Sequence, residues 1–392
     1  MTDDPAGTPD PIEPVESPIV AGPTSVTPPW LRTTLVIALL YLFLVGVKLL
    51  ETGVKGLGED SAGGLFDGIT NPLAALFVGI LATVLVQSSS VTTATIVALV
   101  GAGQLPIEVA VPMVMGANIG TTVTNIIVAL AHARRTDEFR RAFSAATMHD
   151  FFNVITVAIL LPIELVFHPL QNTAAWLAGL LPGGTDASFD SPIKGIVQWG
   201  ATKIAGVVEL IFTSNTSLAI ALIVVGIVII FVCLTYITKN MKTLIANRIE
   251  RSVNAALERS SLVGMGVGVV VTIAVQSSSI TTSIIVPLVA SGLLLVRNAY
   301  PITLGANVGT TITAFIAALA ADSNDAMTIA LVHLLFNVFG ILIIYPIRKF
   351  RYIPVILAEK LAEVAARRKW IAIAYTLIAF VLIPIVGILV LS

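Results

Sequence analysis

The chain has 392 residues, of which 56% are hydrophobic and only 11% are charged. Because soluble domains contain about 25% charged residues, this composition excludes a soluble helical protein and indicates several membrane spans. The net charge of −1 provides no overall field for nucleic acid, and the single cysteine, Cys233, excludes an intrachain disulfide or a thiolate metal cluster.

Residues 1–30 differ from the rest of the chain. They are rich in proline, contain several acidic residues and have no lysine or arginine. Such a segment buries too little apolar area to offset the entropy of ordering it, so we expect a disordered tail. It lacks the basic start and the apolar stretch of a signal peptide, and we expect it on the cytoplasmic side.

Seven apolar segments follow that are long enough to cross a membrane, which takes about 20 helical residues. They cover approximately residues 31–50, 105–131, 142–167, 212–237, 299–320, 326–347 and 371–391. Two further apolar stretches, 69–101 and 262–295, are interrupted midway by polar residues. The pieces after the interruptions are too short to span, so each stretch is expected to form a re-entrant hairpin of half-helices or a broken helix.

The interruptions are copies of one motif. Gln-Ser-Ser-Ser at 87–90 recurs at 276–279, and Gly-Ala-Asn-Ile-Gly-Thr-Thr at 116–122 recurs, with Val for Ile, at 305–311. Both recurrences are 189 residues apart, 276 minus 87 and 305 minus 116. After a five-residue slip, a His-x-x-x-Asn sequence at 149–153 matches one at 333–337. These matches indicate an internal duplication, whose period is too long for a solenoid.

Loop charges indicate that the two copies are inverted. The connector 132–141 carries four arginines, whereas its counterpart at 321–326 carries Asp322, Asp325 and no cation. The positive-inside rule places the first in the cytoplasm and the second outside. We therefore predict an all-α polytopic membrane protein of two inverted-topology repeats, each with a re-entrant helical hairpin that carries Gln-Ser-Ser-Ser. The repeats cover 31–167 and 206–350, an external loop covers 168–205, and an amphipathic segment with a terminal membrane helix covers 351–392.

Each Gln-Ser-Ser-Ser ends one half-helix and starts another. Ser89 or Ser90, and Ser278 or Ser279, are expected to cap the second half-helix, whose free N–H groups and partial positive charge suit an anion. No lysine or arginine lies in either motif, so co-bound cations must offset part of the charge of a bound anion. The nearby Asn and Thr oxygens suit an alkali cation better than a transition metal.

Asp150 has no acidic counterpart in the second copy, where Leu334 takes its place. An ionisable residue just inside a membrane span indicates a function, and we assign Asp150 a role with a cation or a proton. His149 and His333 are expected to be hydrogen-bonded interior histidines.

At these residues the chain resembles the type II sodium–phosphate cotransporter family. The resemblance covers about residues 33–355 and includes both pairs of motifs, Glu-Phe-Arg-Arg-Ala-Phe at 138–143 and His-Asp-Phe-Phe-Asn at 149–153. It implies two inverted repeats with re-entrant hairpins, in which both Gln-Ser-Ser-Ser motifs form the phosphate and sodium region. It also implies a role for Asp150, because electrogenic members carry Asp at the matching position and electroneutral members carry Gly.

We therefore predict a secondary active transporter of the cell membrane, not an enzyme, that couples inward sodium flux to uptake of inorganic phosphate and is electrogenic. Its expected partners are phosphate, the coupling sodium ions and lipid, with no nucleic acid, no cofactor and no transition metal. Two alternatives stay open: a cation-coupled carrier of another small anion, such as a dicarboxylate or sulfate, and an intramembrane serine hydrolase that uses a motif serine with His149 or His333.

The predicted ligands come from both copies. The phosphate ligands are expected among Gln87, Ser88, Ser89, Ser90, Gln276, Ser277, Ser278 and Ser279. The sodium ligands are expected among Thr92, Thr93, Asn118, Thr121, Thr122, Asp150, Thr281, Thr282, Asn307, Thr310 and Thr311.

Overall fold

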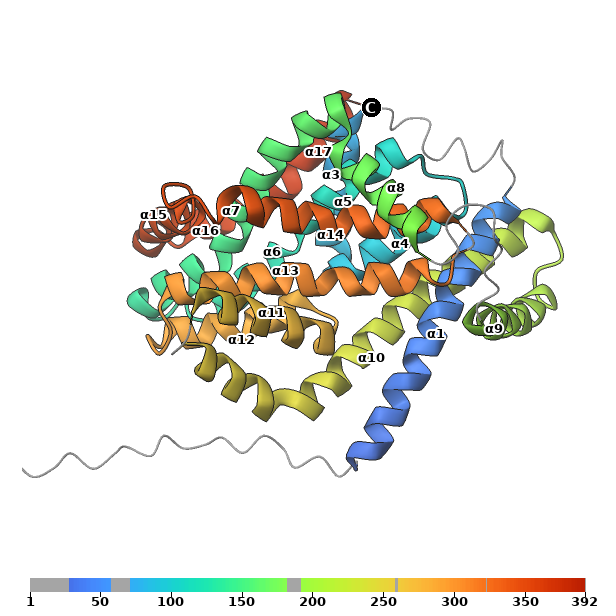
Figure 1. Cartoon of the computed structure of the whole chain (residues 1–392), viewed down its shortest axis with the longest axis horizontal. Helices are drawn as coiled ribbons and strands as arrows, with labels where there is room; N and C mark the ends of the chain where they lie inside the picture. Colours follow the sequence, from blue (N-terminus) through green and yellow to red (C-terminus); the bar gives the residue numbers. More distant parts are fainter. Residues whose placement is uncertain (1–27, 58–70, 182–191, 258–259, 322, 392) are drawn as a thin grey trace, which may run out of the picture.

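The computed structural model describes residues 28–57, 71–181, 192–257, 260–321 and 323–391. Within these ranges the chain is almost entirely helical and contains no strand (Figure 1). Most of the N-terminal tail, which we expect to be disordered, lies outside the described residues, but its last residues are described and begin the first helix. Asp322, one of the two acidic residues of the connector expected outside, also lies beyond the described residues.

The helices run through the chain with short connections. Their bounds are α1 Pro29–Gly56, α3 Pro72–Val86, α4 Ser89–Gly101, α5 Ile107–Gly120, α6 Thr122–Leu130, α7 Thr136–Phe167, α8 Pro169–Leu180, α9 Pro192–Glu209, α10 Asn215–Leu257, α11 Ser261–Val275, α12 Ser278–Ala290, α13 Val296–Ala318, α14 Asn324–Ile344, α15 Ile353–Arg367, α16 Trp370–Leu377, a π-helical turn Ile378–Leu382, and α17 Ile383–Leu391.

Seven of the described helical segments are long and apolar enough to cross a membrane. They are Trp30–Gly56, Ile107–Leu130, Thr136–Phe167, Asn215–Met241, Val296–Ala318, Asn324–Ile344 and Trp370–Leu391. Each contains most of one of the seven segments expected from the sequence, so the prediction of an all-helical multi-pass membrane protein is confirmed.

The two interrupted stretches are also as expected in one respect, because each forms two short helices. α3 and α4 are separated at Gln87 and Ser88, and α11 and α12 at Gln276 and Ser277. The segment 168–205, expected to be an external loop, contains α8 and most of α9. α10 continues without a break from its apolar part, Asn215–Met241, to Leu257.

Glycines bring the helices of each copy into backbone contact. A Cβ atom built on Gly79 of α3 would lie 2.0 Å from the carbonyl oxygen of Met113 in α5, and one on Gly268 of α11 would lie 2.0 Å from that of Ile302 in α13. Gly79 and Gly268 are 189 residues apart, as are Met113 and Ile302. The duplicated sequence therefore packs in the same way twice, α3 on α5 and α11 on α13.

The remaining helices surround these two pairs. α13 and α14 pack together across the middle of the molecule in Figure 1, with α3 and α5 above them and α11 and α12 below. α1 packs along α10, α15 packs against α7, and α17 packs against α3. Each Gln-Ser-Ser-Ser interruption thus lies in a hairpin that packs against longer helices, α4 against α13 and α12 against α7.

Candidate functional site

The two interruptions have nearly the same backbone. Gln87 and Gln276 adopt left-handed conformations, with φ of 55° and 59°, and the serine after each is extended, with φ of −153° and −154°. Left-handed φ is uncommon for a residue with a side chain and costs conformational energy, which proteins often accept at functional sites. Each interruption is therefore a specific, repeated bend of the chain.

The helix-capping residue in each motif is the first serine. The Ser88 hydroxyl oxygen accepts from the N–H of Val91 at 3.3 Å, and the Ser277 oxygen accepts from the N–H of Ile280 at 3.4 Å. The expectation that Ser89 or Ser90, and Ser278 or Ser279, would cap these helices is wrong by one residue. The reason is the left-handed glutamine, which ends the first helix and allows the next to begin immediately after Ser88 and Ser277.

The residues after the caps offer donors to an anion. Ser89 and Ser90 lie in the first turn of α4, where an α-helix has no intrahelical acceptor for its N–H groups. Ser89, Ser90 and Ser278 are buried, and Ser279 is partly buried. Buried donors at the positive end of a helix are suited to a small oxyanion.

The two motifs contact each other directly. The Ser90 hydroxyl donates to the main-chain carbonyl of Gln276 at 3.3 Å, and both groups are buried. A second contact between the copies joins α12 to α6, where the Thr282 hydroxyl donates to the Asn125 side-chain oxygen at 2.7 Å. The structure thus brings residues 186 and 157 positions apart in the sequence together in one polar region.

The threonines expected to bind sodium are buried, but several already bond to protein. The hydroxyl of Thr310 accepts from the N–H of Ser278 at 3.1 Å, and Thr281 bonds to Thr272 at 2.8 Å. The hydroxyl of Thr122 has no hydrogen-bond partner among the described residues. The hydroxyls of four others, Thr92, Thr93, Thr121 and Thr311, donate to carbonyls three or four residues earlier in the chain. A donating hydroxyl keeps its oxygen lone pairs, so such residues can still coordinate a cation.

Asn118 and Asn307, the other predicted sodium ligands, form two reciprocal clusters between the copies. His149 bonds through Nε2 to the Asn307 side-chain oxygen at 2.5 Å, and Asn307 donates to the Asn153 side-chain oxygen at 2.9 Å. In the other direction, the Asn118 side-chain oxygen lies 3.4 Å from Nε2 of His333 and 3.3 Å from the amide nitrogen of Asn337. The expectation that both histidines are hydrogen-bonded interior residues is confirmed.

Asp150 takes no part in the hydrogen bonds of these clusters among the described residues. It is 1% exposed, and its Oδ2 accepts a hydrogen bond from the hydroxyl of Tyr375 in α16. Its other oxygen, Oδ1, has no hydrogen-bond partner among the described residues. A buried carboxylate with one unpartnered oxygen is costly to keep charged unless a cation or a further donor approaches it.

Four residues of this region were not predicted as site residues. Asn153 and Asn337 belong to the duplicated His-x-x-x-Asn sequences, and that duplication was the signal that could have identified them. Asn125 has no polar counterpart, since Ala314 lies 189 residues later, and Tyr375 follows both copies. Nothing in the local sequence of these two residues shows what they contact.

Comparison with known proteins identifies the family of this chain. The family model described as Na+/Pi-cotransporter matches residues 42–180 and 229–383, which include both Gln-Ser-Ser-Ser motifs, both His-Asn clusters and Asp150. The chain belongs to the Na+/Pi-cotransporter family. This family comprises transporters, so the prediction that the chain is not an enzyme is confirmed.

Several members of this family are clearly similar to the chain along most of its length. Sodium-dependent phosphate transport protein 2A of Rattus norvegicus is 34% identical over 425 residues, which cover 90% of this chain and 67% of the relative. Sodium-dependent phosphate transport protein 2B of Homo sapiens is 30% identical over 444 residues, covering 90% of this chain and 64% of the relative. The chain therefore spans about two thirds of the length of these relatives. No solved structure matches it.

Proposed function

We propose that this protein couples inward sodium flux to the uptake of inorganic phosphate, at a site that both Gln-Ser-Ser-Ser motifs form together. The observation that carries the proposal is the hydrogen bond from Ser90 of one motif to the Gln276 carbonyl of the other. It brings the starts of α4 and α12 into one buried region, so that two helix N-termini can share one anion.

Sodium is needed because the protein supplies no cationic side chain in either motif. Phosphate carries one to two negative charges near neutral pH, and helix N-termini with hydroxyls provide only partial positive charge. Co-bound sodium ions supply the rest, with ligands drawn from the Asn and Thr oxygens around the motifs. Hard oxygen ligands of this kind suit an alkali cation. The names of the relatives, which describe sodium-dependent phosphate transport, support the same pairing of ions.

We further propose that the chain forms two inverted repeats, at 31–167 and 206–350, each with a re-entrant hairpin, α3–α4 and α11–α12. The equal glycine packing of α3 on α5 and of α11 on α13 supports the repeat. In Figure 1 the connection from α6 to α7 lies at the left end, whereas the connection from α13 to α14 lies at the right end, which supports the inversion. Segments 168–205 and 351–392 then lie outside the repeats.

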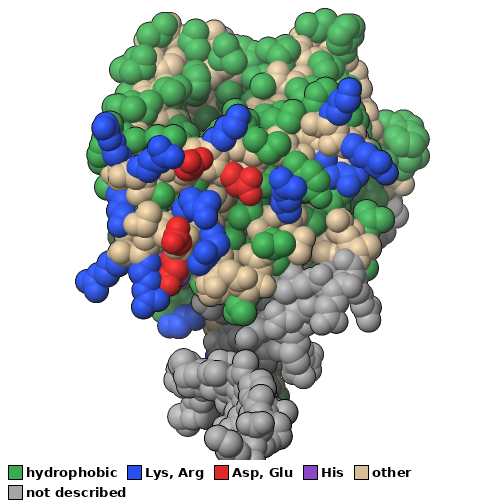
Figure 2. Space-filling view, turned by 90° about the vertical axis from the view of Figure 1, so that its left-hand side faces the viewer, with side chains coloured by type: hydrophobic (Ala, Val, Ile, Leu, Met, Phe, Trp, Pro, Cys, Tyr) green, Lys and Arg blue, Asp and Glu red, His purple; other side chains and the backbone are tan. Residues whose placement is uncertain are grey.

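The charges support one orientation in the cell membrane. Figure 2 looks at the left end of Figure 1, where α15 and the start of α7 lie, and shows Lys and Arg side chains spread across this face. Arg140 and Arg141 of α7 and Lys360 of α15 line one surface pocket together with Glu359 and Glu363. By the positive-inside rule this face is cytoplasmic, and α1 then begins on the cytoplasmic side as well.

Asp150 is the residue we propose for the charge-carrying sodium. It is a buried acid with one oxygen that has no partner in the described part of the chain, and Leu334 in the second copy offers no ligand. Transport of an additional sodium ion at this carboxylate makes the cycle electrogenic. The serine hydrolase alternative is disfavoured, because the Nε2 atoms of His149 and His333 bond to Asn307 and Asn118 and not to a motif serine.

Uptake of labelled phosphate by proteoliposomes tests the proposal. An inward sodium gradient should drive accumulation, and replacing sodium by choline should abolish it, because the bound anion then lacks its counter-charge. Calorimetric titration with phosphate should give strong binding in sodium and weak binding in choline.

Competition separates phosphate from other anions. Excess unlabelled phosphate should suppress uptake, while sulfate and a dicarboxylate should leave it unchanged. Suppression by either of these at concentrations similar to phosphate would favour the more general anion carrier. Equal phosphate affinity in sodium and choline would show that the protein neutralises the anion alone.

A further inference from the structure

The C-terminal helical segment Trp370–Leu391 lies outside the two proposed repeats and has few neighbours. It is apolar enough to cross a membrane, yet only 11% of the residues in its most apolar stretch are buried inside the molecule. Of its described side chains, only Ala372, Phe380 and Pro384 are fully buried. Because so little of this segment is buried, its few specific contacts determine where it lies against the rest of the protein.

The most specific of these contacts is between Tyr375 and Asp150. The Tyr375 hydroxyl donates to Oδ2 of the carboxylate, and the Tyr375 ring packs beside Phe151, with the ring centroids 6.4 Å apart. Oδ1 of Asp150 remains without a partner among the described residues. At the equivalent position of the second copy, Leu334 could not accept this hydrogen bond.

The π-helical turn keeps Tyr375 on the buried face of its segment. In a regular α-helix, residues five positions apart point about 140° away from each other. The turn Ile378–Leu382 inserts one residue, and the rings of Tyr375 and Phe380 accordingly meet edge to face with centroids 6.0 Å apart. Single π-helical turns are often found at functional sites.

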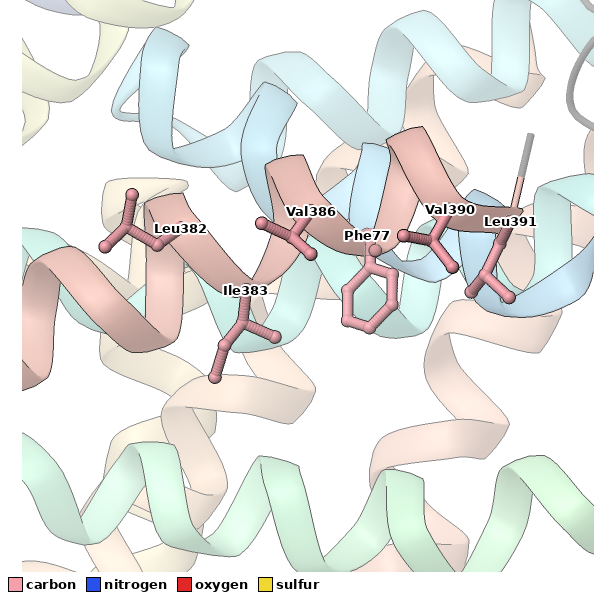
Figure 3. Close-up of a pocket in the computed structure, with 7 residues that line it drawn as sticks. Phe77, Leu382, Ile383, Val386, Val390 and Leu391 are labelled. Atoms are coloured by element: carbon pink, nitrogen blue, oxygen red, sulfur yellow. The ribbon is translucent and has the colours of Figure 1, made fainter.

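Contacts before and after Tyr375 attach the segment to the first copy. Lys369 donates from Nζ to the main-chain carbonyl of Ala133, which follows α6. Further along, the Phe77 ring of α3 lies against the backbone of α17 at Gly387, where a built Cβ would be 2.2 Å from the ring. Figure 3 shows this ring close to Val386 and Val390. α3 is the helix that ends at Gln87, so the segment touches both Asp150 and the helix before the first motif.

We propose that Tyr375 is a positioning residue of the cation site at Asp150: it holds the carboxylate by Oδ2 and leaves Oδ1 to coordinate sodium. The inference rests on the proposed role of Asp150 in sodium binding. It makes the C-terminal segment a part of the coupling machinery, although this segment contributes no residue to either motif.

The physical basis is the cost of orienting a buried carboxylate. A carboxylate that rotates freely presents either oxygen, or both, to the apolar surroundings, whereas a donor on one oxygen fixes the plane of the group. Hydrogen bonds to charged groups are about twice as strong as neutral ones. Loss of the hydroxyl should therefore weaken sodium binding about tenfold, which corresponds to about 1.4 kcal/mol.

The test is the sodium dependence of phosphate uptake by Tyr375→Phe in proteoliposomes. This variant removes only the hydroxyl, so the apparent sodium constant should rise about tenfold, while the apparent phosphate constant at saturating sodium stays as in the wild type. Tyr41→Phe is the matched control, because it removes a hydroxyl that donates to the Ile196 carbonyl far from Asp150 in the sequence. Its sodium constant should be unchanged.

A double variant shows whether Tyr375 acts through Asp150. In the Asp150→Gly background, adding Tyr375→Phe should change the sodium constant less than twofold. An unchanged sodium constant in Tyr375→Phe alone would overturn the inference, and so would an equal shift in both backgrounds. If Asp150→Gly itself alters neither the sodium constant nor the response to membrane potential, the proposed role of Asp150 fails, and the inference fails with it.

A second measurement keeps the hydroxyl and so does not depend on the folding of Tyr375→Phe. With 3-fluorotyrosine at position 375, the 19F resonance should shift when sodium is added and remain fixed when choline is added. The shift should disappear in the Asp150→Gly protein. If the 19F resonance does not shift on addition of sodium in the otherwise unchanged protein, sodium does not bind at the carboxylate that Tyr375 holds.

Discussion

The two copies of the duplicated segment agree in their backbone and differ in a few side chains. Both have a left-handed glutamine, a capping serine and a glycine contact between paired helices. In the first copy Gln87 is exposed, and its side-chain oxygen accepts a hydrogen bond from Thr124. In the second copy Gln276 is buried, and its main-chain carbonyl accepts a hydrogen bond from the Ser90 hydroxyl. The backbone and helix packing, which we call the frame, are thus the same in both copies, whereas several side-chain contacts differ.

The differences divide the polar residues into two groups. Residues present twice, such as the motif serines, are those we propose for the shared anion site. Residues present once include Asp150 and Asn125, whose counterparts are Leu334 and Ala314. The backbone is the same in both copies, so any difference between the copies must come from the residues present once. We therefore expect these residues to be the ones that add a charge to the transport cycle. Comparison of the copies therefore separates binding from coupling.

Breaking the shared frame should have the largest effect. Gly79→Ala and Gly268→Ala each force a methyl group against a main-chain carbonyl, and such overpacking costs about 3 kcal/mol. The Tm of the purified protein in detergent should fall by about 5 °C in each variant.

Gly266→Ala is the matched control on α11. A Cβ there meets nothing within 4 Å, so the Tm should stay the same or rise slightly through better helix propensity. Equal damage from Gly266→Ala and Gly268→Ala would mean that the close helix contact is not what stabilises the pair. Damage in only one copy would show that the frame is less symmetric than the glycine contacts indicate.

Removing one motif hydroxyl should have an intermediate effect. Ser89→Ala and Ser278→Ala should each raise the apparent phosphate constant about tenfold at saturating sodium, because each removes one hydrogen bond to a charged ligand. Ser291→Ala, at the exposed end of α12, should leave that constant unchanged. Wild-type kinetics in both motif variants would exclude a shared phosphate site, and a change in only one would assign phosphate to a single copy.

Removing Asp150, which has no acidic counterpart in the second copy, should have the smallest effect on uptake in the absence of a membrane potential. Asp150→Gly should still transport phosphate with sodium, but an imposed membrane potential should no longer change the rate, because one charge per cycle is lost. Leu334→Gly makes the same backbone change in the second copy and should respond to potential as the wild type does. A response that persists in Asp150→Gly, or that is absent from the wild type, would contradict the assignment.

The membrane helices could be predicted from the sequence because their signal is local. Seven apolar segments correspond to seven helices of spanning length, and the polar interruptions at 87–90 and 276–279 do break their helices. The serine that caps each break was missed by one residue, since capping depends on the backbone of the preceding glutamine. The helices α8 and α9 were missed because segment 168–205 was interpreted by its low charge alone.

Most contacts within the candidate site could not be predicted from the sequence. Ser90 and the Gln276 carbonyl are 186 positions apart, and His149 and Asn307 are 158 apart. Their meeting depends on how whole helices pack, which no local pattern encodes. Asp150 could be singled out by its chemistry, whereas its partner Tyr375, 225 positions later, has an ordinary setting in an apolar helix.

The close glycine contacts limit how this protein can move. Helices whose backbones touch cannot slide or tilt against each other without collision, so α3 with α5, and α11 with α13, must each travel as a rigid body. Between the two hairpins, α3–α4 and α11–α12, by contrast, the contacts include single hydrogen bonds such as that from Ser90 to the Gln276 carbonyl, which water can replace at little cost. Motion within this part of the protein should therefore be a rocking of one pair against the other, with the hinge in the connections and not in the paired helices.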